Sequence, residues 1–484
     1  MKLRQLIKDV PNLEVKGSKD IEIAGLACHS NCVAPGCLFI AKRGASFDGN
    51  RFIPEVIMSG AVAILSDVYD PSIKQVTQII AKDVGRAEGD LAATFWGYPA
   101  DELNLVGVTG TAGKTTTSYI THQLFSHFGK KSGLIGTVSY VAGKRECEAS
   151  RTTPDVISNQ RFLREVVKAG CEACVMEVTS HALCQGRVAH IDFDTAIFTN
   201  LTHEHLDYHK TMEAYAEAKS RLFSSLGKKK DPVAIYNAQA PFAQRIVGTP
   251  HARCFSYALD APADLVAKEV NLLPQKTTFL LQFQKEVIPV TIPLMGRFNV
   301  YNTLAAASVF ISRGYSLEEV AQGLEKIFPP PGRLERVENS KNLTIYVDYA
   351  HKEDALKNVL ATIRESAPKK LILVFGCGGD RDKEKRSKMA QAAEKYADIV
   401  IVTSDNPRSE NPETIIQEIC AGFSHHEPLI IPDRHQAIEK AVSLATDKDI
   451  VLIAGKGHEK KQIFAQGTVL FDDCEVARTC CNKR

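Results

Sequence analysis

Several short segments of this sequence carry the residue types that bind phosphate, metal ions and carboxylates. The first reads Gly-Val-Thr-Gly-Thr-Ala-Gly-Lys-Thr-Thr over residues 107–116. In a Gly-rich turn that leads into a helix, backbone N–H groups cradle phosphate, the Lys114 amine reaches the terminal phosphates and the Thr115 hydroxyl ligates Mg²⁺. Val108 stands where the general phosphate-loop pattern has its first Gly, so the Gly-Lys-Thr-Thr ending carries this prediction. The alternative is a Gly-rich turn with an exposed lysine.

Candidate metal ligands follow along the chain. Glu177 closes an apolar run, and His205 lies in the His-rich segment 200–209. We expect both at strand ends, where a carboxylate and an imidazole can hold the Mg²⁺ ions that neutralise a nucleotide during group transfer. A neutral imidazole is an unusual ligand of Mg²⁺, so spacing alone is weak support for His205.

Two loops in the last third of the chain could bind carboxylates. Arg408 ends the segment Asp405-Asn-Pro-Arg408, and Arg381 lies in the segment 378–383, Gly-Gly-Asp-Arg-Asp-Lys. Each loop follows a predicted strand, and a guanidinium fork binds a carboxylate through two parallel hydrogen bonds. Ordinary surface loops have the same composition, so the pattern by itself leaves both interpretations open.

These segments need regular elements to position them. In the first part of the chain, short apolar runs predict strands and helical periodicity predicts helices. The predicted strands are 37–41, 61–65, 103–108, 174–178 and 195–199, and the predicted helices are 54–60 and 114–128. Their alternation indicates an α/β protein with a largely parallel, doubly wound sheet.

The last third repeats this α/β pattern. Strands are predicted at 371–375, 399–403 and 450–454, each before a loop rich in Gly, Asp or Asn. Because ligands bind at the carboxyl ends of strands in open α/β sheets, these loops are expected to carry the chemistry. Residues 329–332, Pro-Pro-Pro-Gly, stiffen the chain and predict a hinge before this region.

Composition narrows the class of protein. Hydrophobic residues make up 44% and charged residues 24%, and the net charge of +2 offers no broad surface for nucleic acid or an anionic membrane. The charged amino terminus and the lack of a long apolar run predict a cytoplasmic protein. The thirteen cysteines include one C-x-x-C pair, Cys171 and Cys174, so we expect reduced structural thiols in place of a metal or disulfide framework.

Residues 107–117 resemble the nucleotide loop of the Mur ligases and of the related folylpolyglutamate synthases, with Ala112 where many members have Asn. Three later segments, 296–302, 332–335 and 347–351, resemble nucleotide-contacting blocks of that family in their order and spacing. The resemblance implies that ATP is bound by Gly110, Thr111, Ala112, Gly113, Lys114, Thr115, Thr116, Asn299, Asn302, Arg333 and Asp348.

The same resemblance extends to the metal site. Glu177 and His205 lie in segments that match the family's signatures, and Lys219 matches a lysine that is carbamylated in the family. A carbamate supplies an oxygen ligand, whereas an ammonium group would be repelled by Mg²⁺. The implied catalytic residues are Lys114, Glu177, His205 and Lys219. The implied Mg²⁺ ligands are Thr115, Glu177, His205 and the Lys219 carbamate; a solvated helical lysine is the alternative.

A UDP-linked peptide substrate is implied between the first two regions. Hydroxyl, amide and guanidinium groups suit its diphosphate, sugar and carboxylate oxygens. By resemblance its contacts are Ser30, Thr152, Thr153, Thr179, Gln185 and Arg187. The chain departs from the family pattern at His29 and Asn31, which replace the Asp and Arg of a common Asp-Ser-Arg motif, and at Arg151, where Asn can occur.

The incoming amino acid is implied to bind in the last region. The Asp-Asn-Pro-Arg loop resembles that of the diaminopimelate-adding members, whereas lysine-adding members lack its arginine because lysine has no second carboxylate. Glu459 is implied to pair with an ammonium group of the substrate. The implied pocket residues are Arg381, Asp405, Asn406, Pro407, Arg408, Gly455 and Glu459.

The resemblance implies an architecture and an activity. The expected domains are a small N-terminal α/β domain (1–98) for the UDP-substrate, a central P-loop-type ATPase domain (99–331) with a doubly wound parallel sheet, and a C-terminal Rossmann-like α/β domain (332–484) for the amino acid. The expected reaction is ligation of meso-diaminopimelate to UDP-N-acetylmuramoyl-L-alanyl-D-glutamate with ATP and Mg²⁺, through an acyl phosphate, by a cytoplasmic monomer that neither binds nucleic acid nor enters the membrane. The alternatives are a lysine-adding or folate-glutamylating relative, or an ATP-binding scaffold without turnover.

Overall fold

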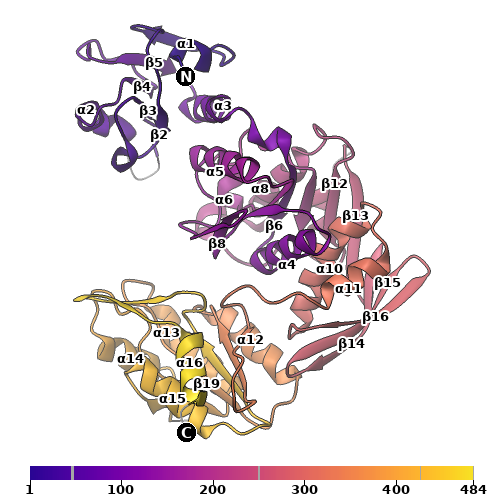
Figure 1. Ribbon diagram of the computed structural model, residues 1–484. Coiled ribbons are helices and arrows are strands. Elements are labelled where there is room, and N and C mark those ends of the chain that lie inside the picture. Colours follow the sequence, from indigo (N-terminus) through magenta and orange to yellow (C-terminus); the bar gives the residue numbers. More distant parts are fainter. Residues whose placement is uncertain (45–47, 249–250, 426, 483–484) are drawn as a thin grey trace. The chain divides into compact units, whose positions relative to one another are not determined.

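The computed structural model describes residues 1–44, 48–248, 251–425 and 427–482. The chain forms two compact units, Met1–Ser256 and Tyr257–Arg484. Figure 1 labels their helices and strands. Both units are built from helices and mainly parallel sheets, which confirms the predicted α/β class. No described helix has the length and apolar character needed to cross a membrane.

A five-stranded sheet forms the start of the first unit, in the order β1-β5-β4-β3-β2, with only β1 antiparallel to its neighbour. The strands are β1 (Leu13–Lys16), β2 (Gly25–Ala27), β3 (Cys37–Ile40), β4 (Ala63–Ser66) and β5 (Thr77–Ala81). The helices are α1 (Leu3–Leu6), α2 (Ile53–Met58) and α3 (Val84–Trp96), with 3-10 turns at Ser30–Cys32, Gly49–Phe52 and Pro99–Glu102. The predicted strands at 37–41 and 61–65 and the helix at 54–60 are confirmed.

The rest of the first unit holds a larger sheet in the order β12-β11-β6-β10-β7-β8-β9, parallel from β12 to β7. Its strands are β6 (Asn104–Thr109), β7 (Ser132–Ile135), β8 (Ser139–Ala142), β9 (Arg145–Glu148), β10 (Ala173–Glu177), β11 (Thr195–Phe198) and β12 (Val233–Asn237). Its helices are α4 (Lys114–His127), α5 (Val156–Lys168), α6 (Ser180–Cys184), α7 (Leu206–His209), α8 (Met212–Ser224) and α9 (Ala243–Val247). The predicted strands β6, β10 and β11 and the helix α4 are confirmed.

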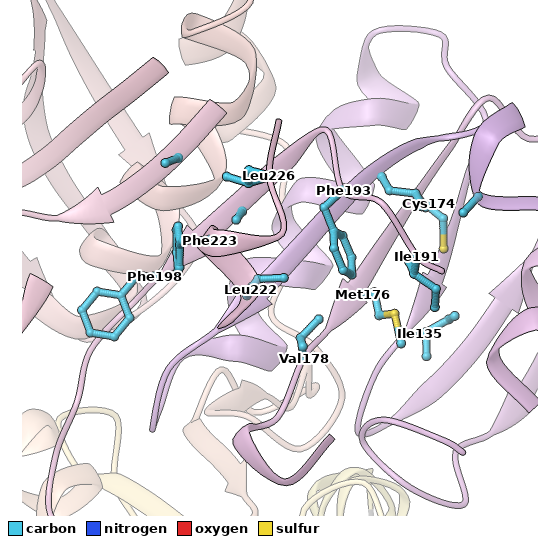
Figure 2. Close-up of a cluster of buried hydrophobic side chains, with 14 of the residues drawn as sticks. Ile135, Cys174, Met176, Val178, Ile191, Phe193, Phe198, Leu222, Phe223 and Leu226 are labelled. Carbon is cyan, nitrogen blue, oxygen red and sulfur yellow. The ribbon is translucent and has the colours of Figure 1, made fainter. Parts of the chain in front are cut away.

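A buried apolar cluster supports this sheet (Figure 2). It joins side chains of β7, β10 and β11 to residues of α8, including Met176, Phe198 and Leu222. A Cβ atom at Gly107 would lie 2.9 Å from the Phe193 ring, so this glycine lets the ring pack directly on β6. Close packing of this kind gives the loop that follows β6 a rigid base.

The second unit begins with strands that were not assigned from the sequence. After β13 (Arg253–Leu259), the strands β14 (Leu265–Leu273), β15 (Lys276–Phe283) and β16 (Glu286–Ile292) form an antiparallel meander. The helices α10 (Arg297–Ile311) and α11 (Leu317–Leu324) pack against β14 and β16.

The second unit ends in a six-stranded sheet in the order β17-β18-β22-β19-β20-β21, parallel except at β17. The strands are β17 (Glu335–Arg336), β18 (Thr344–Asp348), β19 (Leu371–Phe375), β20 (Ile399–Val402), β21 (Leu429–Ile430) and β22 (Ile450–Ala454), followed by the hairpin β23 (Lys461–Phe464) and β24 (Gly467–Leu470). The helices are α12 (Glu353–Glu365), α13 (Glu384–Tyr396), α14 (Pro412–Cys420), α15 (Arg434–Leu444) and α16 (Asp473–Asn482). The predicted strands β19, β20 and β22 are confirmed.

Both faces of that sheet are covered. Leu371, Leu373 and Phe375 of β19 belong to a core with α12, α13 and α14, while Ile372 and Val374 belong to a core with α15 and α16. Successive side chains of a strand point to opposite faces, which explains why a continuous apolar run is needed here.

Candidate active site

The Gly-rich segment forms a tight loop between β6 and α4, as predicted. Gly110 has φ of +153°, and a Cβ atom there would lie 1.9 Å from Thr199 Oγ1, so only glycine fits. The backbone N–H of Ala112 donates to Asn200 Oδ1 at 2.9 Å, which ties the loop to the segment after β11. The seven predicted residues from Gly110 to Thr116 therefore line the start of a helix at the centre of a parallel sheet.

Two lysine amines meet at one carbonyl oxygen of this loop. Lys114 Nζ donates to Gly110 O at 3.0 Å and to Thr111 O at 2.8 Å, and Lys219 Nζ donates to the same Gly110 O at 2.8 Å. Lys219 is 1% exposed. Burial first, and then the charge of Lys114, hold the pKa of Lys219 well below its usual value. A neutral amine, the form that can react with CO₂, is thus favoured at Lys219.

Glu177 is buried at the end of β10 and faces the start of α4. Its Oε2 accepts hydrogen bonds from Thr115 Oγ1 and from Thr137 Oγ1, both at 3.0 Å, and its Oε1 accepts one from the Thr137 N–H at 2.7 Å. A hydroxyl and a carboxylate at this separation form the hard oxygen donor set that Mg²⁺ prefers.

His205 lies farther from its strand than expected. It precedes α7 with φ of +59°, several residues after β11, so the prediction that it sits at a strand end was wrong. A left-handed turn, rare outside glycine, now sets its position. Its ring centroid lies 6.0 Å from that of Tyr215, whose ring also contacts the Lys219 amine at 4.4 Å and whose hydroxyl lies 3.2 Å from Thr111 Oγ1.

Five of the six predicted substrate residues form one hydrogen-bonded group. Thr152 Oγ1 lies 3.1 Å from Thr137 Oγ1, and Thr153 Oγ1 donates to Glu177 O at 2.8 Å. The group continues through Thr179, whose N–H donates to Thr153 Oγ1, and through Arg187, which donates to Thr153 O and to Gln185 Oε1. Ser30 begins a 3-10 turn on the amino-terminal sheet and is half-buried.

Sequence reasoning missed Thr137, although it links three of the predicted residues: Thr115, Thr152 and Glu177. Thr137 follows β7, which pairs in parallel with β10. Its place at the carboxyl end of a parallel strand was the one available signal.

The predicted nucleotide residues of the second unit form two pairs. Asn302 Nδ2 donates to Asn299 Oδ1 at 3.1 Å, and both are buried on α10. Asp348 ends β18, where its carboxylate accepts the N–H of Leu334 at 2.7 Å, next to Arg333. Burial raises the pKa of Asp348 and the charge of Arg333 opposes that rise.

The three loops predicted to bind the amino acid follow the adjacent strands β22, β19 and β20. Asn406 Nδ2 donates to Glu459 Oε2 at 2.7 Å, and Arg408 Nη1 donates to Gly379 O at 2.8 Å. Gly455 approaches so closely that its Cβ would lie 2.6 Å from Asp405 Oδ2, while Pro407 is buried. Arg381 is exposed on the neighbouring loop and donates to Asp380 O at 3.0 Å.

A second residue missed from the sequence is Lys456. It is fully buried, and its amine donates to Asn406 Oδ1 at 3.1 Å and to Glu459 Oε2 at 3.3 Å. Lys456 therefore fixes the positions of Asn406 and Glu459 relative to each other. The sequence showed only that it lies between Gly455 and Gly457.

A Gly-rich loop at the centre of a parallel sheet, with a half-buried lysine, a buried lysine and a buried carboxylate around it, defines a nucleotide-dependent α/β enzyme. Family models described as Mur ligase family, catalytic domain, Mur ligase middle domain, and Mur ligase, glutamate ligase domain match residues 22–96, 108–310 and 332–457. The chain belongs to the Mur ligase family, whose members are ATP-dependent ligases.

Individual relatives agree over the full length. The chain is 42% identical over 490 residues to the UDP-N-acetylmuramoyl-L-alanyl-D-glutamate–2,6-diaminopimelate ligase of Geobacillus thermodenitrificans, covering 100% of both chains. A solved structure of a ligase with the same name has a TM-score of 0.72 at 32% identity, covering 100% of this chain and 99% of that one. A MurF ligase from Thermotoga maritima in complex with ADP shares the fold, with a TM-score of 0.61 at 19% identity over 90% of this chain and 95% of the other.

Proposed function

We propose that this chain joins meso-2,6-diaminopimelate to UDP-N-acetylmuramoyl-L-alanyl-D-glutamate, converting ATP to ADP and phosphate, as a cytoplasmic monomer in peptidoglycan precursor synthesis. The observation that carries the proposal is the contact of Asn406 with Glu459 beside Arg408. An acidic and a guanidinium group on adjacent loops suit an amino acid with an ammonium group and a second carboxylate. The full-length identity to ligases of that name supports the same substrate.

Each of three domains would bind one of the three substrates. Residues 1–98 would hold the UDP end of the substrate with Ser30, residues 99–331 the ATP, and residues 332–484 the amino acid. The group Thr152, Thr153, Thr179, Gln185 and Arg187 would contact the rest of the UDP-linked peptide. Asn299, Asn302, Arg333 and Asp348 would complete the nucleotide site.

The reaction would proceed in two steps. The substrate carboxylate attacks the γ-phosphorus of ATP, giving an acyl phosphate and ADP. The amine of diaminopimelate then attacks the acyl carbon, loses a proton, and expels phosphate from a tetrahedral intermediate to leave the amide. Lys114 would stabilise negative charge on the transferred phosphoryl group, and the loop N–H groups would hold the phosphates in line.

Magnesium fits the oxygen donors around the loop. Thr115, Glu177, His205 and the carbamate of Lys219 would hold it, and Mg²⁺ when bound would neutralise phosphate charge. The carbamate would form when the neutral Lys219 amine adds to CO₂ and releases a proton. Its formation would replace a neutral amine with an anion next to Lys114.

Phosphate release from ATP by the purified chain tests this function. The assay contains UDP-N-acetylmuramoyl-L-alanyl-D-glutamate with meso-diaminopimelate, with lysine, or with no amine. We expect release with diaminopimelate only. Release with lysine would make the chain a lysine-adding relative, release with a folate and glutamate a folate-glutamylating one, and no release with any of these substrates would indicate an ATP-binding scaffold without turnover.

A further inference from the structure

Three side chains that the reaction does not use come together in the first unit. Cys28 and His29 follow β2, and Asp155 is the N-cap residue of α5. One ligand atom from each lies within 4.8 Å of the other two. Within residues 1–44, 48–248, 251–425 and 427–482, this is the only such group of three or more His, Cys, Asp and Glu side chains.

The carboxylate of Asp155 keeps the capacity to bind an ion. Its Oδ1 accepts the Ser158 N–H at 2.9 Å and its Oδ2 accepts Ser158 Oγ at 2.8 Å. Each carboxylate oxygen has two lone pairs, so each retains one after capping the helix. The cap also fixes the carboxylate in place, which lowers the entropy cost of ligation.

The buried side chain of Glu88, which lies near this group, is a second indication that a cation binds here. Glu88 is 2% exposed; its Oε2 bonds to the Lys42 amine at 2.5 Å, while its buried Oε1 has no hydrogen-bond partner. Burial raises the pKa of the Cys28 thiol, and the charges of Asp155 and Glu88 raise it further. Glu88 and Asp155 therefore place two acidic side chains next to the thiol, where a cation would be stabilised.

We propose that Cys28, His29 and Asp155 form a binding site for a thiophilic divalent metal ion, with Zn²⁺ as the ion that best fits the set. A thiolate, an imidazole and a carboxylate are ligands that Zn²⁺ accepts together, whereas Mg²⁺ does not take sulfur. Ligands on one tetrahedral Zn²⁺ lie roughly 3.3–3.8 Å apart, since its bonds are about 2.0–2.3 Å long. Side-chain rotations that move the ligand atoms by about an ångström would bring all three within bonding distance of one ion. A water molecule would take the fourth position.

Ion binding has a defined proton balance. The Cys28 thiol loses its proton to solvent as the sulfur–zinc bond forms, so one proton leaves for each ion bound. His29 would bind through a ring nitrogen and Asp155 through a carboxylate oxygen. The bound ion would join the segment after β2 to the start of α5, elements that lie far apart in the sequence.

The test is a titration of the full-length chain with Co²⁺ in excess Mg²⁺, followed by displacement with Zn²⁺. A thiolate bound to Co²⁺ gives a charge-transfer absorption that oxygen and nitrogen ligands lack, so this signal separates the Cys28 site from any Mg²⁺ site around Glu177. We expect the band to saturate at one equivalent and to vanish when Zn²⁺ is added. No band at one equivalent would overturn the proposal.

Two variants and one control locate the site. Cys28→Ser should abolish the band, and His29→Asn, at an exposed side chain, should weaken Co²⁺ binding by at least about 10–100-fold. The matched control is Cys32→Ser, an exposed thiol of the same segment, which should bind as the parent chain does. A band that persists in Cys28→Ser, or unchanged affinity in His29→Asn, would contradict the assignment. Circular dichroism checks folding, and the His29 variant decides the question if the Cys28 variant unfolds.

Discussion

The phosphate loop of the first unit and the amino-acid loops of the second unit hold their charged groups in different ways. Around the phosphate loop, two lysine amines share the Gly110 carbonyl. In the second unit, the amine of Lys456 donates directly to the carboxylate of Glu459, and the side chain of Asn406 forms a hydrogen bond with each of them. The first arrangement gathers basic groups where a phosphate would bind, while the second places a basic and an acidic side chain next to each other. Substitutions in the first should therefore impair turnover, and substitutions in the second should alter the choice of amino acid.

The largest effect is expected at Lys219. Lys219→Ala removes the amine from Gly110 O and, with it, the proposed carbamate, so phosphate release should fall by about 10³-fold, as for loss of a group that stabilises transition-state charge. Kinetics with saturating substrates measure this, with the exposed Lys144→Ala as control. Intact-protein mass spectrometry in bicarbonate should show one added CO₂ in the parent and none in the variant; an unmodified parent would refute carbamylation.

Arg408→Lys tests the amino-acid loops of the second unit. The lysine amine cannot reproduce the guanidinium fork, so the preference in kcat/KM for diaminopimelate over lysine should fall by about 10–100-fold. Turnover at saturating diaminopimelate should change little. Competition assays with both amines measure the preference, and Arg478→Lys at an exposed site is the control. An unchanged preference would remove Arg408 from the specificity site.

Thr137 tests whether the buried carboxylate needs its hydroxyl partner. Thr137→Ala deletes the 3.0 Å hydrogen bond to Glu177 Oε2 and keeps the backbone bond, so kcat should fall by about tenfold. Thr137→Ser keeps the hydroxyl and should retain most of the activity. Equal losses in the two variants would mean that the methyl group, and not the hydrogen bond, matters.

The smallest effect concerns stability of the second unit. Glu410 accepts two hydrogen bonds at 3.0 Å from the buried Arg386, which lowers its pKa from 4.5 to about 2. The pKa of Glu410 is lower in the folded state than in the unfolded state, so its ionised carboxylate stabilises the folded chain. This stabilisation is complete above about pH 4.5 and is lost as the pH falls toward 2.

Glu410→Gln should therefore lower Tm at pH 7 by a few degrees, and the difference from the parent should shrink as the pH falls toward 2. Thermal unfolding followed by circular dichroism measures both values. Glu427→Gln, at an exposed position, is the control. A difference in Tm that stays constant with pH would show that charge on Glu410 is not the cause.

The parallel strands could be predicted from the sequence because their residues are apolar on both faces. The predictions at 371–375 and 450–454 coincide with β19 and β22 for this reason. The meander β14–β16 was not assigned, since strands such as β15 bury only alternate residues. A short strand in which apolar and polar residues alternate gives a weaker sequence signal than a continuous apolar run.

For the candidate site, the sequence predicted residues whose position follows from a strand end. Glu177 and the loop at Gly110 lie where β10 and β6 end. Thr137 could not be placed because it follows β7, a strand that was not predicted. His205 and Lys456 could not be placed, because a left-handed turn fixes the first and hydrogen bonds between distant segments fix the second. Contacts of that kind depend on tertiary packing and leave no local pattern in the chain.

The two amines that meet at the Gly110 carbonyl predict that nucleotide binding is accompanied by proton uptake. In the unmodified chain, burial and the charge of Lys114 hold the pKa of the Lys219 amine well below its usual value. Polyphosphate arriving at the loop brings negative charge that favours the ammonium form, so ATP binding draws a proton from the buffer. A chain that carries the proposed carbamate at Lys219 would have no such proton to gain. The heat of ATP binding, compared between buffers of different ionisation enthalpy, thus reports how much of a sample carries the carbamate.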